Sequence, residues 1–218
     1  MEKLLTAHEA IERIHDGARI MIGGFGLRGC PDGLIDELVA SGKKDLTIIS
    51  NDLGSPNEGL GRLYSNGQVK SLIGSYYNWN PEVIEAYNRG EISVKLVPQG
   101  TLAESMRAAG TGIPAYYTPT SAGTELEAGK ETRQFNGVDC VLEEAIHADV
   151  ALICASKSDT LGNLCYSKTA RNFNPVMAMA ADYTIAEVAE IVEAGELDPE
   201  EIVTPHIYVN AIVKRSAK

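Results

Sequence analysis

The sequence predicts an α/β protein with an open, mostly parallel sheet flanked by helices. Short apolar runs typical of buried strands alternate along the chain with helical patterns, which is the order expected of a parallel sheet. Some of these runs are apolar without interruption, as expected when both faces of a strand are covered. The 218 residues, 44% of them hydrophobic, suffice for one core. With no repeat or linker in view, we expect a single domain over residues 1–218.

The first elements follow from capping and stop residues. Thr6 can cap an amphipathic helix, and Glu9 three residues later completes a capping box. Gly17 ends this helix. The apolar run 18–22 predicts the first strand, and an amphipathic stretch at 32–42 predicts the helix that follows it.

The rest of the chain alternates in the same way. Apolar and β-branched runs predict strands at 46–50, 69–77, 94–98, 138–144 and 149–156. Helical patterns lie between them at 80–90 and 100–110. The stretch 183–193 fits a strand as well as a helix, because its β-branched residues alternate with other types.

Composition excludes several classes of protein. The net charge of −11 argues against nucleic-acid binding, since no basic surplus is available to neutralise phosphates. No apolar stretch reaches the roughly 20 residues that a membrane-spanning helix needs. The acidic N-terminus is unlike a signal peptide, and no HxxxH or HExxH spacing indicates a metal site. The four cysteines lack CxxC spacing and are expected to be buried or free thiols. We therefore expect a cytoplasmic protein without a metal.

A glycine-rich stretch links the first strand to its helix. Residues 23–29 contain four glycines, and a turn of this kind can offer free backbone N–H groups and a helix N-terminus to an anion. A purely structural turn explains the pattern equally well. No Lys-Ser/Thr follows, so the turn is not a P-loop. The order Gly24-x-Gly26-x-x-Gly29, with Asp52 after the second strand, also permits an NAD-binding unit.

Two amide side chains follow predicted strands. Asn51 stands at the end of the run 46–50, and Gln99 follows the run 94–98. Ligands bind at the carboxyl ends of parallel strands, so these amides either decorate the surface or point into one crevice. There they would position a reacting group without being one. No serine, cysteine or carboxylate in the chain has the setting of a nucleophile.

Segments throughout the chain resemble one known family. They are "DGARIMIGGFGLRGCP" (16–31), "LTIISND" (46–52), "PQGTLAE" (98–104), "GIPAYYTPT" (112–120), "GNLCYSKTARNFNP" (162–175) and "VTPHIYVNAIV" (203–213). In this order they resemble the alpha, or A, subunit of family I CoA-transferases. The resemblance is closest to the acetate/butyrate–acetoacetate and succinyl-CoA:3-oxoacid enzymes of short-chain fatty acid and ketone-body metabolism. It implies a CoA-transferase-like fold.

The resemblance also implies a mechanism and a partner. In this family a glutamate attacks an acyl-CoA, and a glutamyl-CoA thioester then passes CoA to a second carboxylic acid such as acetoacetate, acetate or butyrate. That glutamate lies in a Glu-Asn-Gly motif of the beta subunit, and the tripeptide does not occur here. We therefore expect activity only with a beta subunit, in a hetero-oligomer such as α2β2. Coenzyme A would be a substrate, with no permanently bound cofactor.

The family pattern assigns roles to particular residues. Asn51 and Gln99 match amides that hold the catalytic glutamate in place. The residues that match the CoA-binding glycine signature are Gly23, Gly24, Phe25, Gly26, Leu27, Arg28 and Gly29.

Some positions depart from the usual pattern, among them Arg28, Cys30, Tyr77, Trp79 and His206. Tyr77 and Trp79 either pack over the following helix or line the acyl pocket, so the departures bear on acyl specificity. Two other interpretations stay open: an NAD-dependent dehydrogenase, and a module that senses CoA or a sugar phosphate on a similar scaffold.

Overall fold

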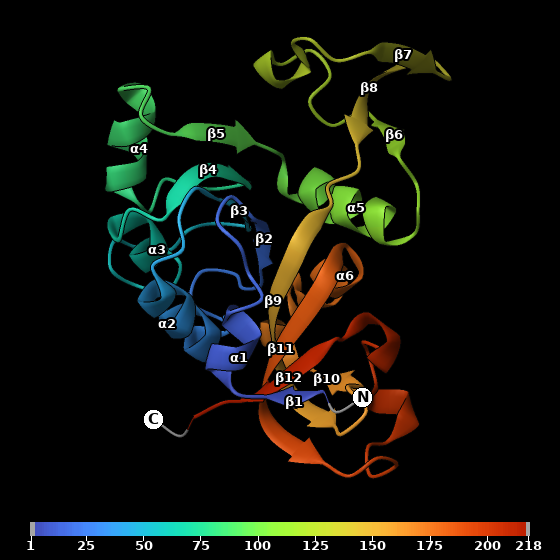
Figure 1. Ribbon diagram of the computed structural model, residues 1–218. Coiled ribbons are helices and arrows are strands. Elements are labelled where there is room, and N and C mark those ends of the chain that lie inside the picture. Colours follow the sequence, from blue (N-terminus) through green and yellow to red (C-terminus); the bar gives the residue numbers. More distant parts are fainter. Residues whose placement is uncertain (1–2, 217–218) are drawn as a thin grey trace.

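The computed structural model describes residues 3–216, which form one large sheet with helices on both faces and one small sheet (Figure 1). The large sheet contains β1 (Leu4–Leu5), β2 (Arg19–Ile22), β3 (Leu46–Ile49), β4 (Val69–Gly74), β5 (Ser93–Leu96), β9 (Ala148–Asp159), β10 (Leu164–Cys165), β11 (Ala181–Val192) and β12 (Ala211–Lys214). The small sheet contains β6 (Ala115–Thr118), β7 (Thr132–Phe135) and β8 (Val138–Glu144). The α-helices are α1 (Ala7–Ile11), α2 (Asp32–Ser41), α3 (Gly61–Ser65), α4 (Pro81–Asn88), α5 (Gln99–Gly110) and α6 (Asn174–Met179).

The large sheet is almost entirely parallel. Its strand order is β1-β12-β11-β9-β2-β3-β4-β5, with every neighbouring pair parallel, and β10 alone pairs antiparallel, with β9. The predicted α/β fold with an open, mostly parallel sheet is confirmed. From β2 the chain moves outward through β3, β4 and β5, and it returns to the other side of β2 as β9. The boundary between β2 and β9 is therefore the point at which the strand order reverses, where open α/β sheets bind ligands.

The two faces of the sheet bury separate cores. Ile20 and Ile22 of β2 belong to the core covered by α1, α2, α3 and α4, whereas Met21 between them belongs to the core covered by α5 and α6. Alternation of side chains along a strand accounts for this division. Each of these three side chains is fully buried and contributes roughly 1.5–3 kcal/mol relative to exposure. Both faces of β2 are thus apolar, which explains its uninterrupted apolar sequence.

Three elements differ from the sequence-based expectation or settle it. Helix α1 has the predicted capping box, but it ends at Ile11 instead of Gly17. The ambiguous stretch 183–193 is a strand, because β11 pairs with β9 over most of its length. The strand predicted at 138–144 exists as β8, but it pairs antiparallel with β6 and β7 and so lies outside the parallel sheet.

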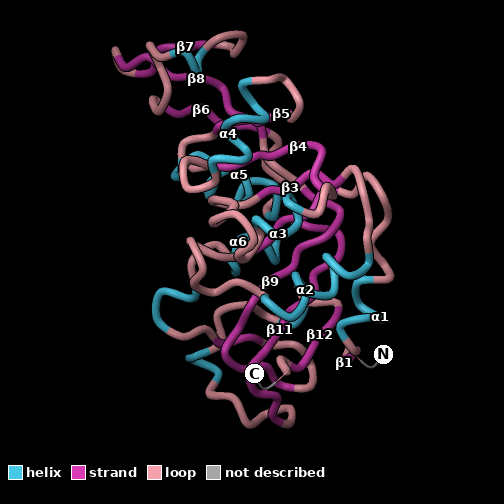
Figure 2. Tube along the Cα trace, turned by 90° about the vertical axis from the view of Figure 1, so that its left-hand side faces the viewer, coloured by secondary structure: helices cyan, strands magenta, loops and turns pink. Residues whose placement is uncertain are grey.

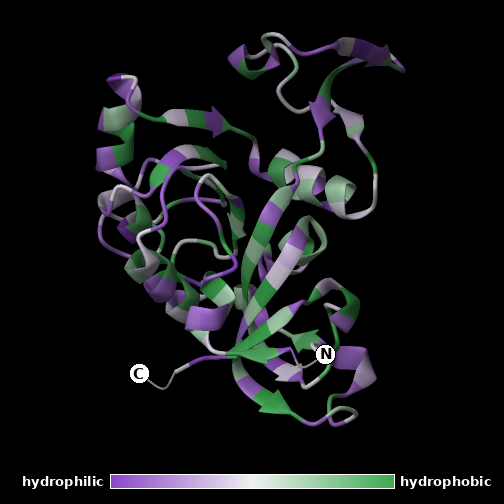
Figure 3. Cartoon of the chain, viewed as in Figure 1, coloured by the Kyte–Doolittle hydropathy of each residue, from purple (hydrophilic) through white to green (hydrophobic). Residues whose placement is uncertain are grey.

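The small sheet projects from the body of the molecule (Figures 1 and 2). All four residues of β7 are exposed, and this strand is mostly hydrophilic, whereas β9 and β11 in the body are largely hydrophobic (Figure 3). Within residues 3–216, none of the helices has both the length and the apolar character needed to span a bilayer.

Candidate active site

Three segments meet at the carboxyl ends of β2, β3 and β5. The glycine-rich loop 23–29 follows β2, Asn51 follows β3, and Gln99 begins α5 after β5. The backbone oxygen of Asn51 accepts hydrogen bonds from the N–H groups of Ser75 and Tyr76, each at 3.0 Å, which fixes the chain where it leaves β3. The site therefore lies beside the reversal point of the sheet.

The two amides that the sequence singles out are bonded to each other. Gln99 Nε2 donates to Asn51 Oδ1 at 2.8 Å, although the residues lie 48 positions apart. Asn51 is buried, and its Nδ2 donates to Asp52 Oδ2 at 2.8 Å. Gln99 is exposed, so this chain of hydrogen bonds leads from the interior to the surface. The expectation that both amides face one crevice describes their geometry.

The glycine loop is closed by its own backbone. Phe25 and Arg28 exchange N–H···O bonds at 3.0 and 3.1 Å, which makes Gly26-Leu27 the tip of a tight turn. Gly26 N–H donates to Asp52 Oδ2 at 2.8 Å, and Gly24 N–H donates to Asn172 Oδ1 at 3.2 Å.

The loop is therefore a poor backbone cradle for a phosphate. Gly23 N–H also donates inside the chain, to the Leu152 oxygen at 2.9 Å. Five of the seven N–H groups in 23–29 are thus already used. The expectation of free N–H groups at this turn is wrong, because the chain itself supplies their acceptors.

The N-terminus of the next helix is occupied as well. Helix α2 has Pro31 at its N-cap and no side-chain cap of its own. Instead Leu34 N–H donates to Glu187 Oε2 at 2.9 Å, from a buried carboxylate on β11. Glu187 Oε1 accepts from Arg215 Nε at 2.7 Å. A carboxylate from within the chain therefore stabilises the positive end of α2, where an outside anion was expected.

Two asparagines hold the loop from behind, and sequence reasoning missed them both. Asn172 Nδ2 donates to the Arg28 oxygen at 3.0 Å, and Asn174 Nδ2 donates to the Gly29 oxygen at 3.1 Å. A Cβ at Gly23 would overlap Asn174 Oδ1. The close approach that the glycines permit is thus made by the chain's own segment 170–174. The motif "RNFNP" before α6 is the signal that could have found this contact.

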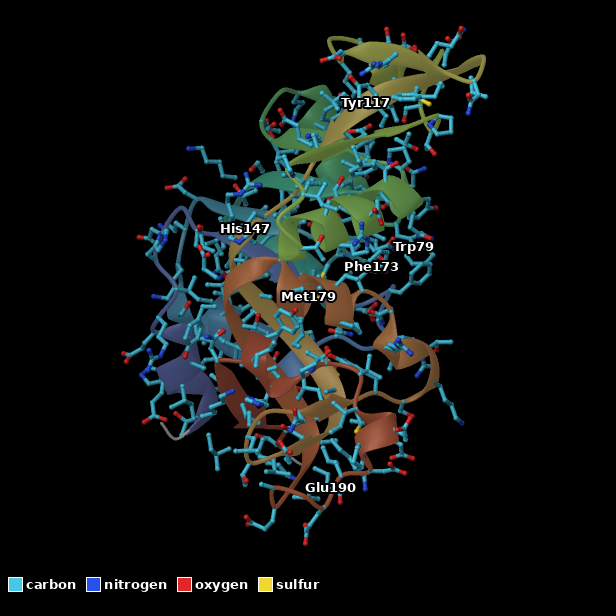
Figure 4. All side chains as sticks on the ribbon, turned by 90° about the vertical axis from the view of Figure 1, so that its right-hand side faces the viewer. Trp79, Tyr117, His147, Phe173, Met179 and Glu190 are labelled. Atoms are coloured by element: carbon cyan, nitrogen blue, oxygen red, sulfur yellow. The ribbon has the colours of Figure 1, made fainter. Side chains whose placement is uncertain are left out.

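The loop presents side chains to the surface. Phe25, Leu27 and Arg28 are exposed, and Arg28 forms no ion pair with any residue in 3–216. Trp79 lies against the loop: its ring would be 3.3 Å from a Cβ at Gly26. Figure 4 shows Trp79 at the outer edge of the molecule. Beside the loop, therefore, is an apolar surface with one cation.

The structure separates the two aromatic residues that the sequence grouped. Tyr77 is only 5% exposed and belongs to the core, which supports the packing interpretation for this residue. Trp79 is 53% exposed, and its aromatic neighbour is Tyr76, with ring centroids 5.3 Å apart in an edge-on arrangement. Of the other departures, His206 is exposed and its backbone N–H donates to Asn163 Oδ1 at 2.9 Å.

The cysteines have structural settings. All four are buried and free, as the sequence predicted. Burial raises the pKa of the Cys30 thiol to about 12, so Cys30 is protonated at neutral pH, and it donates to the Gly26 oxygen at 3.3 Å. Burial also raises the pKa of Cys154 and Cys165. A protonated thiol is a weak nucleophile, so Cys30 supports the loop and does not attack a substrate.

The carboxylate bonded to the amide pair is not free to react either. Asp52 Oδ1 accepts from Gly54 N–H at 3.0 Å, and its Oδ2 accepts from Gly26 N–H and Asn51 Nδ2. These bonds also occupy the carboxylate that an NAD-binding unit would need for its ribose, which removes the main support for that interpretation. The site can bind and orient a reacting group, but it supplies no nucleophile of its own.

Comparison with known proteins agrees with this geometry. The family model for coenzyme A transferase matches residues 4–215. One of the two subunits of the succinyl-CoA:3-ketoacid coenzyme A transferase of Helicobacter pylori (strain J99), its A chain, is 53% identical over 215 residues, covering 98% of this chain and 93% of that protein. The alpha chain of the acetate CoA-transferase of Escherichia coli (strain K12) is 46% identical over 211 residues, covering 97% of this chain and 96% of that protein.

The fold is found in a solved structure as well. An acyl-CoA transferase from E. coli O157:H7, crystallised as a thioester complex with CoA, superimposes with a TM-score of 0.86 at 22% identity. The match covers 98% of this chain and 47% of that longer chain. The family-model match and the close relatives together show that this chain belongs to the coenzyme A transferase family.

Proposed function

We propose that this chain is the alpha-type half of a two-subunit CoA-transferase that moves CoA between a short-chain acyl-CoA and a carboxylic acid. The observation that carries the proposal is the Gln99–Asn51 amide pair, which lies beside the glycine loop in a site without a nucleophile. A glutamate of the partner beta subunit fills that gap. Its carboxylate attacks the thioester carbonyl, which forms an acyl-glutamyl anhydride and releases CoA thiolate. The thiolate then attacks the glutamyl carbonyl, which gives the glutamyl-CoA thioester and the free acid.

The amide pair orients that glutamate. Besides the bonds it forms within the chain, each amide has one further N–H available, and N–H groups bind a carboxylate or the oxyanion formed from it. A carboxylate is a weak nucleophile, so a fixed geometry contributes much of its reactivity. Asn51 and Gln99 thus act as supporting catalytic residues.

The glycine loop contributes to CoA binding through its side chains. Since most of its N–H groups bond within the chain, Gly23, Gly24, Gly26 and Gly29 shape the turn. Phe25 and Leu27 then offer apolar surface to the CoA arm, and Arg28 offers a cation to a CoA phosphate. This division of roles agrees with the exposure of the three side chains.

The acceptor acid belongs to the short-chain class. The H. pylori relative is named for succinyl-CoA and a 3-ketoacid, and the E. coli relative is named for acetate. We extend this class to acetoacetate, acetate and butyrate. The full assembly is α2β2 and cytoplasmic, this chain contributes one domain over 1–218, and no permanently bound cofactor takes part.

Reconstitution tests the proposal. We expect the isolated chain to show no CoA transfer, and we expect a mixture with a beta-type partner carrying a Glu-Asn-Gly segment to show it. The assay is transfer from succinyl-CoA or acetyl-CoA to a panel of short acids. Robust turnover by the isolated chain would overturn the two-subunit proposal, and an inactive but stable complex would overturn the reaction class.

Trp79 is expected to influence acid preference. Its exposed ring lies against the loop that we assign to CoA, so Trp79→Ala widens the adjacent space without disturbing the core. A pocket difference of one methylene is worth about 1–3 kcal/mol. The ratio of kcat/KM for butyrate over acetate should therefore change several-fold. Tyr87→Ala, which removes another exposed ring, is the control. Equal changes for both acids would contradict a role in specificity.

A further inference from the structure

Asp52 connects the two halves of the site through one carboxylate oxygen. Its Oδ2 accepts from Asn51 Nδ2 and from Gly26 N–H, both at 2.8 Å, and its Oδ1 accepts from Gly54 N–H at 3.0 Å. The residue is 3% exposed. The amide pair and the glycine loop are therefore anchored on the same atom, although they follow different strands.

The chemistry of a carboxylate fixes the direction of these hydrogen bonds. An ionised carboxylate only accepts, so Asn51 must turn its NH2 group toward Asp52. Asn51 Oδ1 then faces Gln99, and Gln99 must turn its own NH2 group toward that oxygen. An amide without such a neighbour can rotate by half a turn and exchange its donor for its acceptor. Asp52 thus determines which atoms of both amides are left for a reacting group.

We propose that Asp52 is a positioning residue for CoA transfer, which acts through Asn51 on Gln99 and through Gly26 on the glycine loop. This inference rests on the proposed function of the amide pair. Asp52 itself does not contact the reacting atoms. It keeps the free N–H groups of both amides directed at the partner's glutamate, and it holds the loop at a fixed distance from them.

A matched buried carboxylate elsewhere provides the control. Asp159 is 2% exposed and accepts from the N–H groups of Leu161, Gly162 and Asn163 in a turn. It lies at the end of β9, seven residues beyond Leu152, which pairs with the last residue of β2. That is about 23 Å of strand away from the glycine loop. Asp159→Ala should lower stability much as Asp52→Ala does, without affecting the amide pair.

The first experiment uses the reconstituted enzyme. Asp52→Ala should lower kcat by on the order of 10²-fold with a smaller change in KM, because the orientation of both amides is lost. Asp52→Asn keeps one acceptor oxygen that can replace Oδ2, so it should lower kcat by less than about tenfold. Combining Asp52→Ala with Gln99→Ala should cost little more than either change alone. Asp159→Ala should leave kcat unchanged and combine additively with Gln99→Ala.

The second experiment needs no activity and uses the full chain alone. We expect the NMR side-chain amide signals of Asn51 and Gln99 to be shifted and slow in hydrogen exchange, and Gly26 N–H to be protected. In Asp52→Ala, both amides should move toward free-amide positions, and Gly26 should exchange faster. Asp159→Ala should leave all of these signals in place.

These results separate the two ideas. Unchanged Gln99 signals in Asp52→Ala, or additive kinetic effects of Asp52→Ala and Gln99→Ala, would overturn the positioning role. If the NMR result holds while the reconstituted enzyme is inactive with every short acid, the positioning of the amides stands and the proposed function fails.

Discussion

Gly24→Val is expected to abolish CoA transfer. Gly24 has a φ of +137°, which side-chain-bearing residues rarely adopt, and a Cβ there would overlap Cys30 Sγ. Its N–H also donates to Asn172 Oδ1, so a shift of the backbone breaks the contact that holds the loop. Crowding and backbone strain together should lower the free energy of unfolding by about 2–5 kcal/mol. The measurements are kcat/KM in the reconstituted enzyme and the urea midpoint of the isolated chain.

Gly90→Val provides the control for this variant. Gly90 also has a positive φ, of +71°, but no atom lies within 4 Å of a Cβ built there. This change therefore carries the backbone strain without the crowding, at a position outside the site. It should reduce stability and leave kcat/KM within about twofold of the unmodified enzyme. Near-normal kinetics in Gly24→Val itself would show that the loop is only a connector.

Gln99→Ala is expected to lower kcat by on the order of 10²-fold, with a smaller change in KM for either acid. Gln99 is exposed at the first position of α5, so its truncation leaves the core intact. The variant therefore removes orientation of the reacting glutamate and little else. Steady-state kinetics with acetate and acetoacetate provide the measurement.

Gln134→Ala is the matched control for Gln99→Ala. Gln134 is also exposed, and its Nε2 donates to Asp139 Oδ1 at 3.1 Å in the small sheet. Its truncation should leave kcat unchanged. If Gln99→Ala also leaves kcat unchanged, the amide pair has no role in the reaction.

Much of the fold follows from local patterns in the sequence. The capping box at Thr6 and Glu9 forms as predicted, since it depends only on residues three positions apart. Both apolar faces of β2 follow from its uninterrupted Ile-Met-Ile. The small sheet could not be placed in this way, because β8 reads as a strand but nothing local says which strands it pairs with. Its separate position depends on β6 and β7, which the sequence did not predict.

The site was predictable where position in the sheet decides it. Asn51 and Gln99 could be singled out because each follows a strand, and the carboxyl ends of parallel strands share an edge. The acceptors of the loop N–H groups could not be predicted in the same way. Asn172 is 148 positions from Gly24, and only the fold brings it there. Asp52 was noticed for another reason, as a ribose ligand, and the structure gives it a different use.

The location of CoA during the reaction tests the central claim most directly. The chain alone, the partner alone and the reconstituted complex are each mixed with acyl-CoA and no acceptor acid, and intact-protein mass spectrometry reads the mass of each polypeptide. We predict a CoA adduct on the partner, formed only when this chain is present and slowed by Gln99→Ala. An adduct on this chain, or an equally fast adduct on the partner alone, would contradict the account.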